Sequence, residues 1–438
     1  MLKAHQLDYN DQGNLLFGRV DTVTLAKKYG TPLFVYDVEK IRNNAQAFLK
    51  AFKSLNVKAR VAYASKAFST IAMAQVAHEE SLYLDVVSKG ELYTALQANF
   101  PTEKIHFHGN NKSYEEIDMA IKNNIGCIVI DNFYEIELLE QVLEERHAKI
   151  DALIRISPGV SVDTHHYVQT GDEDSKFGFH LKSSQADIAF KKLHNHPRIR
   201  FIGVHCHIGS QIFQTNHYIQ ALRIVMEKIN EWKKETNYVP SVLNIGGGFG
   251  IRYTKDDKPL HPSRYIKDIV YHVKQMSLKI NIPLPEIWIE PGRSIVGDAG
   301  ITLYTVGSMK NIPNVRKYIS VDGGMTDNLR PALYNASYEG IIANKANKPL
   351  TEVVSIAGKC CESGDMLVYD LPVAQVESGD IIALFSTGAY GYSMANHYNR
   401  FSKPAVVFLE NEKDYLVVRR ENYEDVVKND LHFKDKKE

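Results

Sequence analysis

The chain has 438 residues, long enough for two ordinary domains, and its 44% hydrophobic content suits a globular protein with a large core. Basic and acidic residues number 52 each, and this balance argues against a nucleic-acid partner, which would need a basic surface. The four cysteines are too few for a disulfide framework and form no CxxC pair, so no structural zinc site is expected. No apolar run is long enough to cross a bilayer, and the first residues lack the apolar core of a signal peptide. We therefore expect a cytoplasmic protein with no membrane partner.

Short apolar runs alternate with helix-like segments through the first three hundred residues. Helical periodicity is clear in 69–79, 135–146 and 218–234. Such alternation favours a parallel sheet, and eight strands over this length fit a (β/α)8 TIM-type barrel that occupies 37–300. An open doubly wound sheet is the alternative topology. The predicted strands are 60–65, 83–88, 104–108, 127–131, 152–157, 201–207, 242–246 and 286–290.

Two regions depart from this regular spacing. The segment 161–192 is inserted between the fifth and sixth strands, and its length and polarity predict a lid at the mouth of the barrel. After residue 300 helical patterns become scarce, which predicts a mostly β domain over 301–438. The strand-like runs 13–17 and 33–36 lead us to expect that 1–36 joins this domain. Its other predicted strands are 301–306, 317–321, 351–357, 381–385, 405–409 and 415–418.

Polar residues follow the predicted barrel strands at several separated places. Because the active site of a (β/α)8 barrel lies at the C-terminal ends of its strands, these residues would meet at one rim. Their convergence is stronger evidence for a site than any single motif. They are Lys66, Asp85, Ser88, His108, Arg155, His207, the glycine run 246–250, Glu290 and Arg293.

Lys66 ends the apolar run 61–67, which is typical of a buried strand. A lysine at the mouth of a low-dielectric site loses hydration, which disfavours the ammonium and makes the amine a nucleophile for an aldehyde. Considered alone, Lys66 is better explained as a strand-end lysine whose long side chain reaches water. The remaining motifs decide between these interpretations.

The glycine run 246–250 follows the seventh strand and Glu290 ends the eighth. Glycines let backbone amides approach and cradle a phosphate, and barrels commonly bind phosphate after strands seven and eight. A flexible turn is the alternative. The Glu290 carboxylate needs a partner, for which a protonated pyridine nitrogen would serve. Arg293 could bind the phosphate or a substrate carboxylate, and an internal Glu–Arg pair remains an equal alternative.

Two histidines, His205 and His207, end the sixth strand and are followed by Ser210. Residues i and i+2 of a strand face the same way, so both rings could point into the barrel. Some metal-dependent barrel hydrolases begin with such a pair, but usually on the first strand, so we expect no metal. His207 is better interpreted as stacking on a flat cofactor ring and Ser210 as a phosphate ligand. His205 fits a core residue.

The predicted β domain has its own polar cluster. It includes Arg330 and Tyr334, the Gly-rich turn that holds Cys361 and Glu362, and Tyr390. Turn chemistry alone accounts for the glycines. A cysteine beside a glutamate in such a turn also suits proton donation together with binding of an amine.

These motifs resemble the fold-type III pyridoxal-phosphate decarboxylases, and within them the branch that acts on diaminopimelate, over essentially the whole chain. The resemblance rests on 63–67, 205–211, 246–250, 290–293, 330–334, 361–363 and 389–390. It implies an alanine-racemase-like fold and pyridoxal 5'-phosphate as cofactor. It also implies a homodimer in which the turn with Cys361 and Glu362 reaches the active site of the partner subunit.

The resemblance also implies a role for each residue. Lys66 would hold the cofactor aldehyde, His207 would stack on its ring, and Cys361 would supply a proton, so these three are the expected catalytic residues. The expected cofactor-binding residues are Lys66, Asp85, His207, Ser210, Gly246, Gly247, Gly248, Glu290, Pro291, Gly292, Arg293 and Tyr390. The expected substrate-binding residues are Arg293, Arg330, Tyr334, Glu362 and Tyr390.

The expected reaction is removal of carbon dioxide from meso-2,6-diaminopimelate to give L-lysine, the last step of lysine biosynthesis. Arg330 would bind a distal carboxylate and Glu362 a distal ammonium, and this substrate carries both. Ornithine, arginine or a carboxy-polyamine is the alternative substrate, but ornithine and arginine would leave Arg330 unpaired. Alanine racemase pairs the ring nitrogen with arginine, so Glu290 favours a decarboxylase. A catalytically dead homologue that regulates an active decarboxylase is a further alternative, although Lys66 and the glycine run are intact.

Overall fold

The computed structural model describes residues 8–160 and 175–433. The chain divides into two compact units. The barrel unit comprises Ile41–Ile251 and Lys258–Ile295; the β unit comprises the chain up to Lys40, the segment Arg252–Asp257 and everything from Val296 onward. Within the described ranges, no helix combines the length and apolar character needed to cross a membrane.

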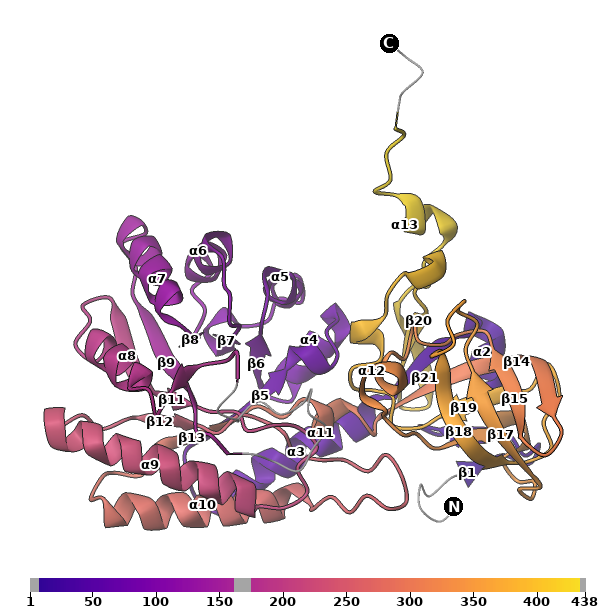
Figure 1. Cartoon of the computed structure of the whole chain (residues 1–438), viewed down its shortest axis with the longest axis horizontal. Helices are drawn as coiled ribbons and strands as arrows, with labels where there is room; N and C mark the ends of the chain where they lie inside the picture. Colours follow the sequence, from indigo (N-terminus) through magenta and orange to yellow (C-terminus); the bar gives the residue numbers. More distant parts are fainter. Residues whose placement is uncertain (1–7, 161–174, 434–438) are drawn as a thin grey trace. The chain divides into compact units, whose positions relative to one another are not determined.

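The barrel unit is built around a closed ring of parallel strands (Figure 1). The ring closes because β13 pairs with β5 and β8 pairs with β9, and every neighbouring pair is parallel. The predicted (β/α)8 barrel is therefore confirmed, and the open doubly wound alternative is wrong. The ring strands are β5 (Ala59–Ala64), β6 (Tyr83–Val86), β7 (Ile105–Phe107), β8 (Cys127–Ile130), β9 (Ile150–Ser157), β11 (Ile199–His205), β12 (Val242–Asn244) and β13 (Glu286–Ile289).

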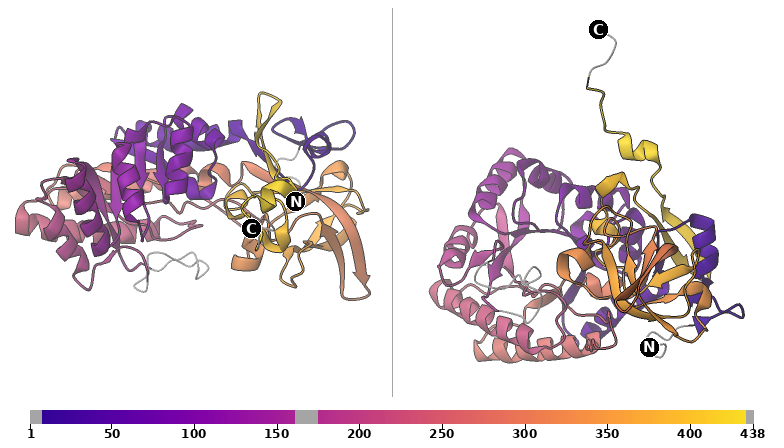
Figure 2. Two further views of the ribbon diagram at one scale, coloured as in Figure 1. Left: turned by 90° about the horizontal axis from the view of Figure 1, so that it is seen from above. Right: turned by 45° about the vertical axis from the view of Figure 1, so that its right-hand side comes forward.

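Helices lie outside this ring of strands (Figure 2), so the strands are covered on both faces and are almost continuously apolar. Inside the ring, an apolar layer below the polar rim is formed by Cys127, Val129, Leu153, Val242 and Trp288. This layer makes the barrel a packed core with chemistry at one end only. The helices are α3 (Val38–Ser54), α4 (Ile71–Glu79), α5 (Lys89–Gln97), α6 (Tyr114–Lys122), α7 (Phe133–Glu145), α8 (Gln185–Leu193), α9 (Asn216–Thr236), α10 (Pro262–Lys279) and α11 (Arg293–Val296).

Polar caps set the starts of several barrel helices. Thr70 accepts from Met73 N–H, Ser88 from Glu91 N–H, and Asn132 from Glu135 N–H, each at the N-terminus of its helix. Ser113 and Glu116 form a reciprocal capping box on α6. Each cap contributes on the order of 1 kcal/mol. The three helices predicted from periodicity are present, with ends shifted by up to two residues.

The insertion predicted between the fifth and sixth strands is shorter than the sequence suggested. The first part of the predicted lid, residues 161–174, lies outside the described residues. The remainder is ordinary barrel structure: β10 (Phe179–His180) pairs with β9 in parallel and α8 packs on this edge. The polar residues 182–184 hid the helix start, because Ser184 adopts left-handed dihedrals and offers no side-chain cap.

The β unit contains a nine-stranded sheet and a small three-stranded sheet formed by β1, β2 and β3. The larger sheet runs β18-β17-β15-β14-β4-β20-β21, with β19 pairing with β14 and β16. The N-terminal strand β4 lies between β14 and β20 of this sheet. The strands are β1 (Asp8–Tyr9), β2 (Leu15–Phe17), β3 (Val20–Asp21), β4 (Leu33–Asp37), β14 (Gly300–Ile312), β15 (Arg316–Val321), β16 (Gly340–Ile342), β17 (Glu352–Ala357), β18 (Met366–Val373), β19 (Ile381–Leu384), β20 (Ala405–Glu410) and β21 (Lys413–Val418).

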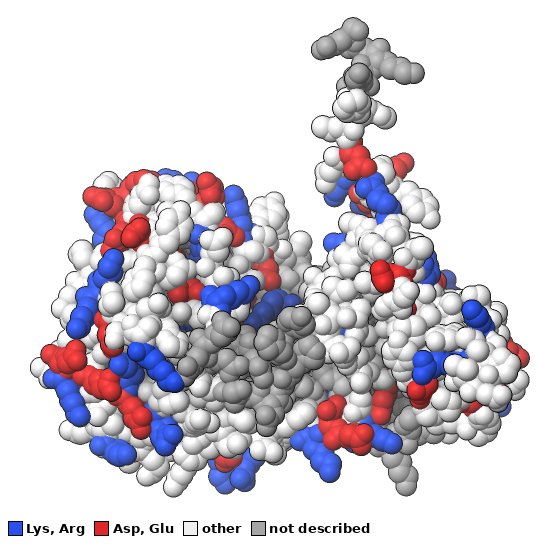
Figure 3. Space-filling view, in the orientation of Figure 1, with Lys and Arg blue, Asp and Glu red and all other residues white. Residues whose placement is uncertain are grey.

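Sequence patterns missed β16, β18 and the short helices α2 (Thr22–Tyr29), α12 (Arg330–Tyr334) and α13 (Tyr423–Val427). Strand β18 contains Asp370 and Pro372, which weaken a strand pattern but are tolerated because β18 lies at the end of the sheet order. On the face seen in Figure 3, basic and acidic side chains are interspersed, as the balanced composition suggests.

Candidate active site

The centre of the barrel rim is the Glu290 carboxylate, which directly follows β13 and is only 6% exposed. Asn244 Nδ2 donates to its Oε1 at 2.6 Å, and His205 Nε2 lies in hydrogen-bonding contact with its Oε2 at 3.1 Å. His108 Nε2 lies 2.8 Å from Oε1. These residues come from β12, β11 and the end of β7, so three separate strands deliver polar groups to one carboxylate.

Neighbouring residues keep the Glu290 carboxyl group ionised. Burial alone would raise the pKa of this carboxyl group, but the nearby His108 and His205 outweigh that effect and hold the pKa well below its usual value. A carboxylate accepts about four hydrogen bonds; Asn244 and His205 supply two, and His108 makes a close ionic contact, which leaves capacity for a further donor. Glu290 is therefore an anion that can receive a further N–H donor.

Asp85, at the end of β6, faces the same cluster and is 4% exposed. Its Oδ1 lies 3.8 Å from His108 Nε2 and has no hydrogen-bond partner. Loss of hydration raises the pKa of Asp85, and His108 only partly opposes this rise. On the next strands, Arg155 lies 3.8 Å from Asp131. A buried acceptor without a donor indicates a place where a ligand or water completes the structure.

His207 lies two residues beyond the end of β11 and has a defined orientation. Gly247 N–H donates to its Nδ1 at 3.2 Å, which fixes Nδ1 as the acceptor and leaves the proton on Nε2. Burial, followed by the positive charge of Lys66, holds the pKa of His207 well below its usual value. The imidazole is therefore neutral, which suits a flat ring that packs against another ring.

The glycine run 246–250 is tightly enclosed by the chain around it. A Cβ at Gly247 would lie 2.2 Å from Glu290 O, and one at Gly248 would lie 2.4 Å from Gly209 O. Gly246 and Gly248 also adopt the positive φ values 69° and 97°, so only glycine fits there without strain. Beside this loop, buried Arg293 donates to Ser210 Oγ at 2.9 Å. Backbone amides, a guanidinium and a hydroxyl gather here, and these are donors for a phosphate.

Lys66 lies beyond the end of β5, in the single 3-10 turn Ser65–Ala67, and its side chain is exposed. The expectation that Lys66 ends a strand is therefore wrong, because β5 stops at Ala64, two residues earlier. The exposed side chain agrees with a lysine that reaches water, and its positive charge still acts on Asp85 and His207 of the rim. The turn itself is firmly held. A Cβ at Gly292 would meet the Cβ atoms of Ala64 and Ala67 at 3.0 Å, so the Lys66 turn packs directly on the segment that follows Glu290.

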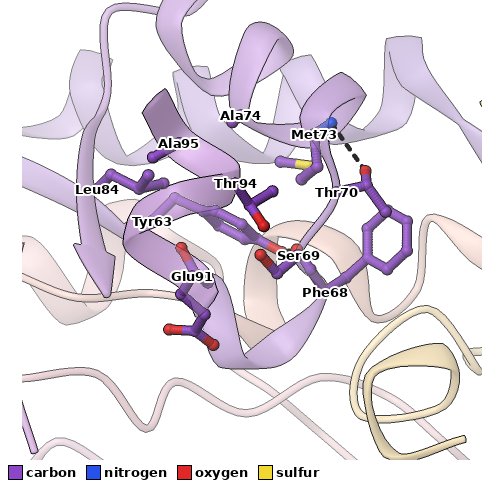
Figure 4. Close-up of a pocket in the computed structure, with 11 residues that line it drawn as sticks. Tyr63, Phe68, Ser69, Thr70, Met73, Ala74, Leu84, Glu91, Thr94 and Ala95 are labelled. Atoms are coloured by element: carbon purple, nitrogen blue, oxygen red, sulfur yellow. Dashed lines mark hydrogen bonds between the residues drawn. The ribbon is translucent and has the colours of Figure 1, made fainter. Parts of the chain in front are cut away.

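A small pocket lies behind the Lys66 turn, with about 200 Å³ of empty space when open solvent is included (Figure 4). Tyr63 and Phe68 line it from the β5 side, and the Tyr63 hydroxyl donates to Phe68 O at 2.8 Å. Glu91 of α5 also lines the pocket, and burial raises its pKa to about 7. The bond from Tyr63 fixes the chain on the C-terminal side of Lys66, so this pocket supports the turn.

The β unit holds a second polar centre around Arg330, which is 8% exposed. Its Nη1 donates to the Tyr338 hydroxyl at 2.5 Å, and its guanidinium lies 4.8 Å from the Tyr253 ring centroid. Burial disfavours the charge, but Tyr253 and Tyr338 keep the pKa of Arg330 above its usual value. No carboxylate of residues 8–160 or 175–433 forms an ion pair with this guanidinium.

The other predicted residues of the β unit occupy different environments. Tyr334 ends α12 and is half-buried, and Tyr390 is half-buried with a φ of 59°, a value that a non-glycine residue rarely adopts. Cys361 and Glu362 are exposed in the turn between β17 and β18. Buried Asp365 organises this turn by accepting from the backbone N–H of Met325 and Cys360.

The structure brings the predicted barrel residues Asp85, Glu290 and His207 together with His205, which sequence reasoning treated as core. His205 is buried as expected, but it hydrogen-bonds Glu290. The ligand atoms of His108, His205 and Glu290 lie within 4.8 Å of one another, a spacing that is also compatible with a metal ion. Because His205 and Asn244 are hydrogen-bonded to the carboxylate, we interpret the cluster as a charge-paired network.

Four contributing residues had no predicted role. His108 was recognised only as a strand-end residue, and Asn244 fell within a predicted strand without a role of its own. Tyr253 flanks Arg330 from a distant part of the sequence, and Tyr338 lies eight residues after it. Tyr253 belongs to the segment Arg252–Asp257, whose Lys255 N–H donates to Glu339 of the β unit at 2.9 Å. No local motif marks these positions, because each acts through a contact that only the fold creates.

Comparison with known proteins agrees with this architecture. The family described as pyridoxal-dependent decarboxylase, pyridoxal binding domain, matches residues 38–297. Diaminopimelate decarboxylase from Bacillus subtilis is 58% identical over 425 residues, which is 97% of each chain. The crystal structure of diaminopimelate decarboxylase from M. jannaschii is 36% identical, covers 99% of both chains and superposes with a TM-score of 0.91. The same enzyme in complex with L-lysine superposes with a TM-score of 0.90 over 97% of this chain and 98% of that one.

The fold and the matched family define the class, a pyridoxal-dependent decarboxylase with a (β/α)8 barrel and a β domain. Identity to the Bacillus protein over nearly the full length narrows the class further. The chain belongs to the diaminopimelate decarboxylase family.

Proposed function

We propose that this chain removes carbon dioxide from meso-2,6-diaminopimelate to give L-lysine, as the last step of lysine biosynthesis, with pyridoxal 5'-phosphate as cofactor. The family and the solved relative that holds L-lysine support the reaction. The observation in this chain that carries the substrate choice is Arg330, a buried guanidinium that the described residues leave without a carboxylate.

The barrel rim fits the cofactor. The glycine run 246–248, where added Cβ atoms would collide with the backbone, would hold the phosphate together with Ser210 and Arg293. Glu290 would receive the ring nitrogen, His207 would pack on the ring, and Lys66 would hold the aldehyde carbon. Asp85, Pro291, Gly292 and Tyr390 complete the proposed set. When bound, the cofactor takes up the electron pair that remains after carbon dioxide leaves.

The chain's own residues set the conditions for this chemistry. Glu290 is an anion and so holds a proton at the ring nitrogen, because an adjacent negative charge favours the protonated form. His207 is neutral and its ring is fixed by Gly247, so it adds no charge that would compete for that proton. Lys66 extends from a turn whose flanking residues are packed, which gives its amine a defined starting point.

Arg330 would bind the distal carboxylate of the substrate, with Tyr334, Tyr390 and Arg293 near the remaining polar groups. A buried guanidinium gains most from a carboxylate, which accepts two parallel hydrogen bonds. Ornithine and arginine lack a second carboxylate, so binding them would leave Arg330 unpaired at a cost in affinity. This is the reason to prefer diaminopimelate over those alternatives.

The exposed turn between β17 and β18 supports a shared active site. Its Cys361 would deliver a proton to the carbon that lost carbon dioxide, and Glu362 would bind the distal ammonium. Both side chains are exposed, while buried Asp365 fixes the turn that presents them. A rigid turn with exposed functional groups suits delivery to a partner subunit, and we infer a homodimer. The four free cysteines suit a reducing compartment such as the cytoplasm.

One assay tests the reaction and its substrate. Purified protein is stripped of cofactor, and carbon dioxide release is followed with meso-diaminopimelate, ornithine and arginine, with and without added pyridoxal phosphate. Of the three compounds, we expect only meso-diaminopimelate to release carbon dioxide, and only when pyridoxal phosphate is added. Turnover of ornithine in preference to diaminopimelate would replace this proposal with the alternative decarboxylase.

Subunit mixing tests the shared site. Lys66→Ala and Cys361→Ala proteins are each expected to be inactive, and mixing them should restore part of the activity because a mixed dimer has one site with both residues intact. Tagged subunits confirm that exchange has occurred. Confirmed exchange without recovery would show that each site is complete within one chain.

A further inference from the structure

His108 lies between two buried carboxylates of the barrel rim. Its Nε2 is 2.8 Å from Glu290 Oε1 and 3.8 Å from Asp85 Oδ1, and all three side chains are at most 6% exposed. It follows β7, whereas Asp85 lies on β6 and Glu290 follows β13. One imidazole therefore connects groups from three parts of the barrel.

The two histidines on Glu290 make different contacts. His205 meets hydrogen-bond geometry with Oε2. His108 Nε2 is closer to the carboxylate but does not meet that geometry, so its contact is mainly one of charge. The two rings pack edge to face with centroids 4.9 Å apart, so they share one dry environment and differ in their ionic surroundings.

The charged groups around His108 explain this difference. Burial disfavours the imidazolium of His108, as does Arg155, whereas Asp85 and Glu290, which face the ring directly, favour it. The two carboxylates prevail and raise the pKa of His108 above its usual value. Burial lowers the pKa of His205 to about 4, and Glu290 only partly opposes this. His205 is thus a neutral partner and His108 a cationic one.

We propose that His108 is a positioning residue whose fixed positive charge, held between Asp85 and Glu290, keeps Glu290 ionised and aimed at the ring nitrogen of the cofactor. The inference deepens the proposed function, because it rests on Glu290 as the partner of that nitrogen. Without the cation, burial would dominate and Glu290 would take up a proton at a higher pH. A neutral carboxyl group no longer favours a proton on the ring nitrogen.

A matched pair of variants separates charge from hydrogen bonding. His108→Gln and His205→Gln each replace a buried imidazole of the same cluster with a neutral side chain that still donates. Cofactor is removed from each protein, and the dissociation constant for pyridoxal phosphate is measured by fluorescence titration between pH 5 and 8. The melting temperature of each stripped protein reports whether it is folded.

For His108→Gln we expect cofactor affinity to fall about tenfold or more, and for His205→Gln less than about threefold. As the pH is lowered, His108→Gln should begin to lose cofactor affinity about one to three pH units above the pH at which the wild-type protein does. The proposal would be overturned if the two folded variants showed the same cofactor affinity and the same pH dependence. So would a folded His108→Gln protein whose affinity and pH profile match the wild type.

Two further measurements keep the outcomes separate. Nitrogen-15 NMR of histidine in the stripped wild-type protein reports the charge of His108 without relying on a variant that could misfold; a neutral His108 at pH 7 would overturn the proposal. Glu290→Gln, measured in the same titration, tests the proposed function itself. If that variant binds the cofactor normally with an unchanged absorbance spectrum, the assigned role of Glu290 fails, whatever the charge of His108.

Discussion

The two polar centres of the molecule handle buried charge in opposite ways. In the barrel unit, Glu290 is surrounded by His108, His205 and Asn244, so its charge is compensated by residues of the same unit. In the β unit, Arg330 has a tyrosine hydroxyl and an aromatic face but no carboxylate among the described residues. One centre is electrostatically complete, and the other still needs an anion.

This difference in charge compensation indicates a different role for each centre. A buried charge without a partner is costly, so a fold retains one mainly where a ligand supplies the partner. The compensated centre is suited to hold a reactive group in a fixed electrostatic field. The uncompensated centre is suited to select a substrate by charge. Changes in the first should therefore affect the rate of the reaction, and changes in the second should affect substrate binding.

The largest effect is expected at Lys66, next to the compensated centre. Lys66→Ala removes the amine that would hold the cofactor, so carbon dioxide release from meso-diaminopimelate should fall to background. Because the side chain is exposed, the melting temperature of the stripped protein should stay within a few degrees of the wild type. Residual turnover near the wild-type rate would remove Lys66 from the mechanism and leave the barrel centre without its assigned chemistry.

Glu290→Gln should slow decarboxylation on the order of a hundredfold to a thousandfold, because a neutral amide does not stabilise a protonated ring nitrogen. Its effect on stability has a defined pH dependence. The pKa of Glu290 is depressed below 4.5, so its ionised form stabilises the stripped protein above that pH and this contribution is lost as pH falls through the folded pKa. Urea unfolding of stripped wild type and variant should therefore differ most near neutral pH and converge in acid. A difference that grows in acid would contradict the assigned charge.

Arg330→Met tests the uncompensated centre. We expect the KM for meso-diaminopimelate to rise roughly tenfold to a hundredfold, the range for losing a charge-assisted hydrogen bond, with a smaller effect on kcat. Stability of the stripped protein should be unchanged or increased, because an uncompensated buried charge has been removed. Arg330→Lys keeps the charge without the two-pronged geometry and should be intermediate. A marked loss of stability in Arg330→Met would mean that this centre is structural.

The sequence predicted the barrel well because its strands are continuous apolar runs bounded by polar rim residues, and these features are local. Glu290 and His207 could be found for the same reason. The compensation of Glu290 by His108 and Asn244 could not, since it depends on which strands become neighbours when the ring closes. The placement of Lys66 at a strand end was wrong because strand ends are poorly marked in a sequence, and β5 stops at Ala64 before a 3-10 turn. Tyr253 was hidden because its segment belongs to the β unit although the barrel flanks it on both sides in the chain.

Tyr338→Phe should give the smallest effect and sharpens the description of the Arg330 centre. The variant keeps the ring, whose centroid lies 5.6 Å from the guanidinium, but removes the hydroxyl that accepts from Nη1. Losing one such bond corresponds to a change of a few-fold to about tenfold, so the KM for meso-diaminopimelate should rise modestly while kcat stays near the wild-type value. Tyr253→Leu removes the aromatic face and leaves the hydroxyl of Tyr338, which makes it the complementary variant. If Tyr338→Phe alone raised the KM as much as Arg330→Met, the hydroxyl would be what fixes the guanidinium for the substrate, and the aromatic face would serve only to cover it.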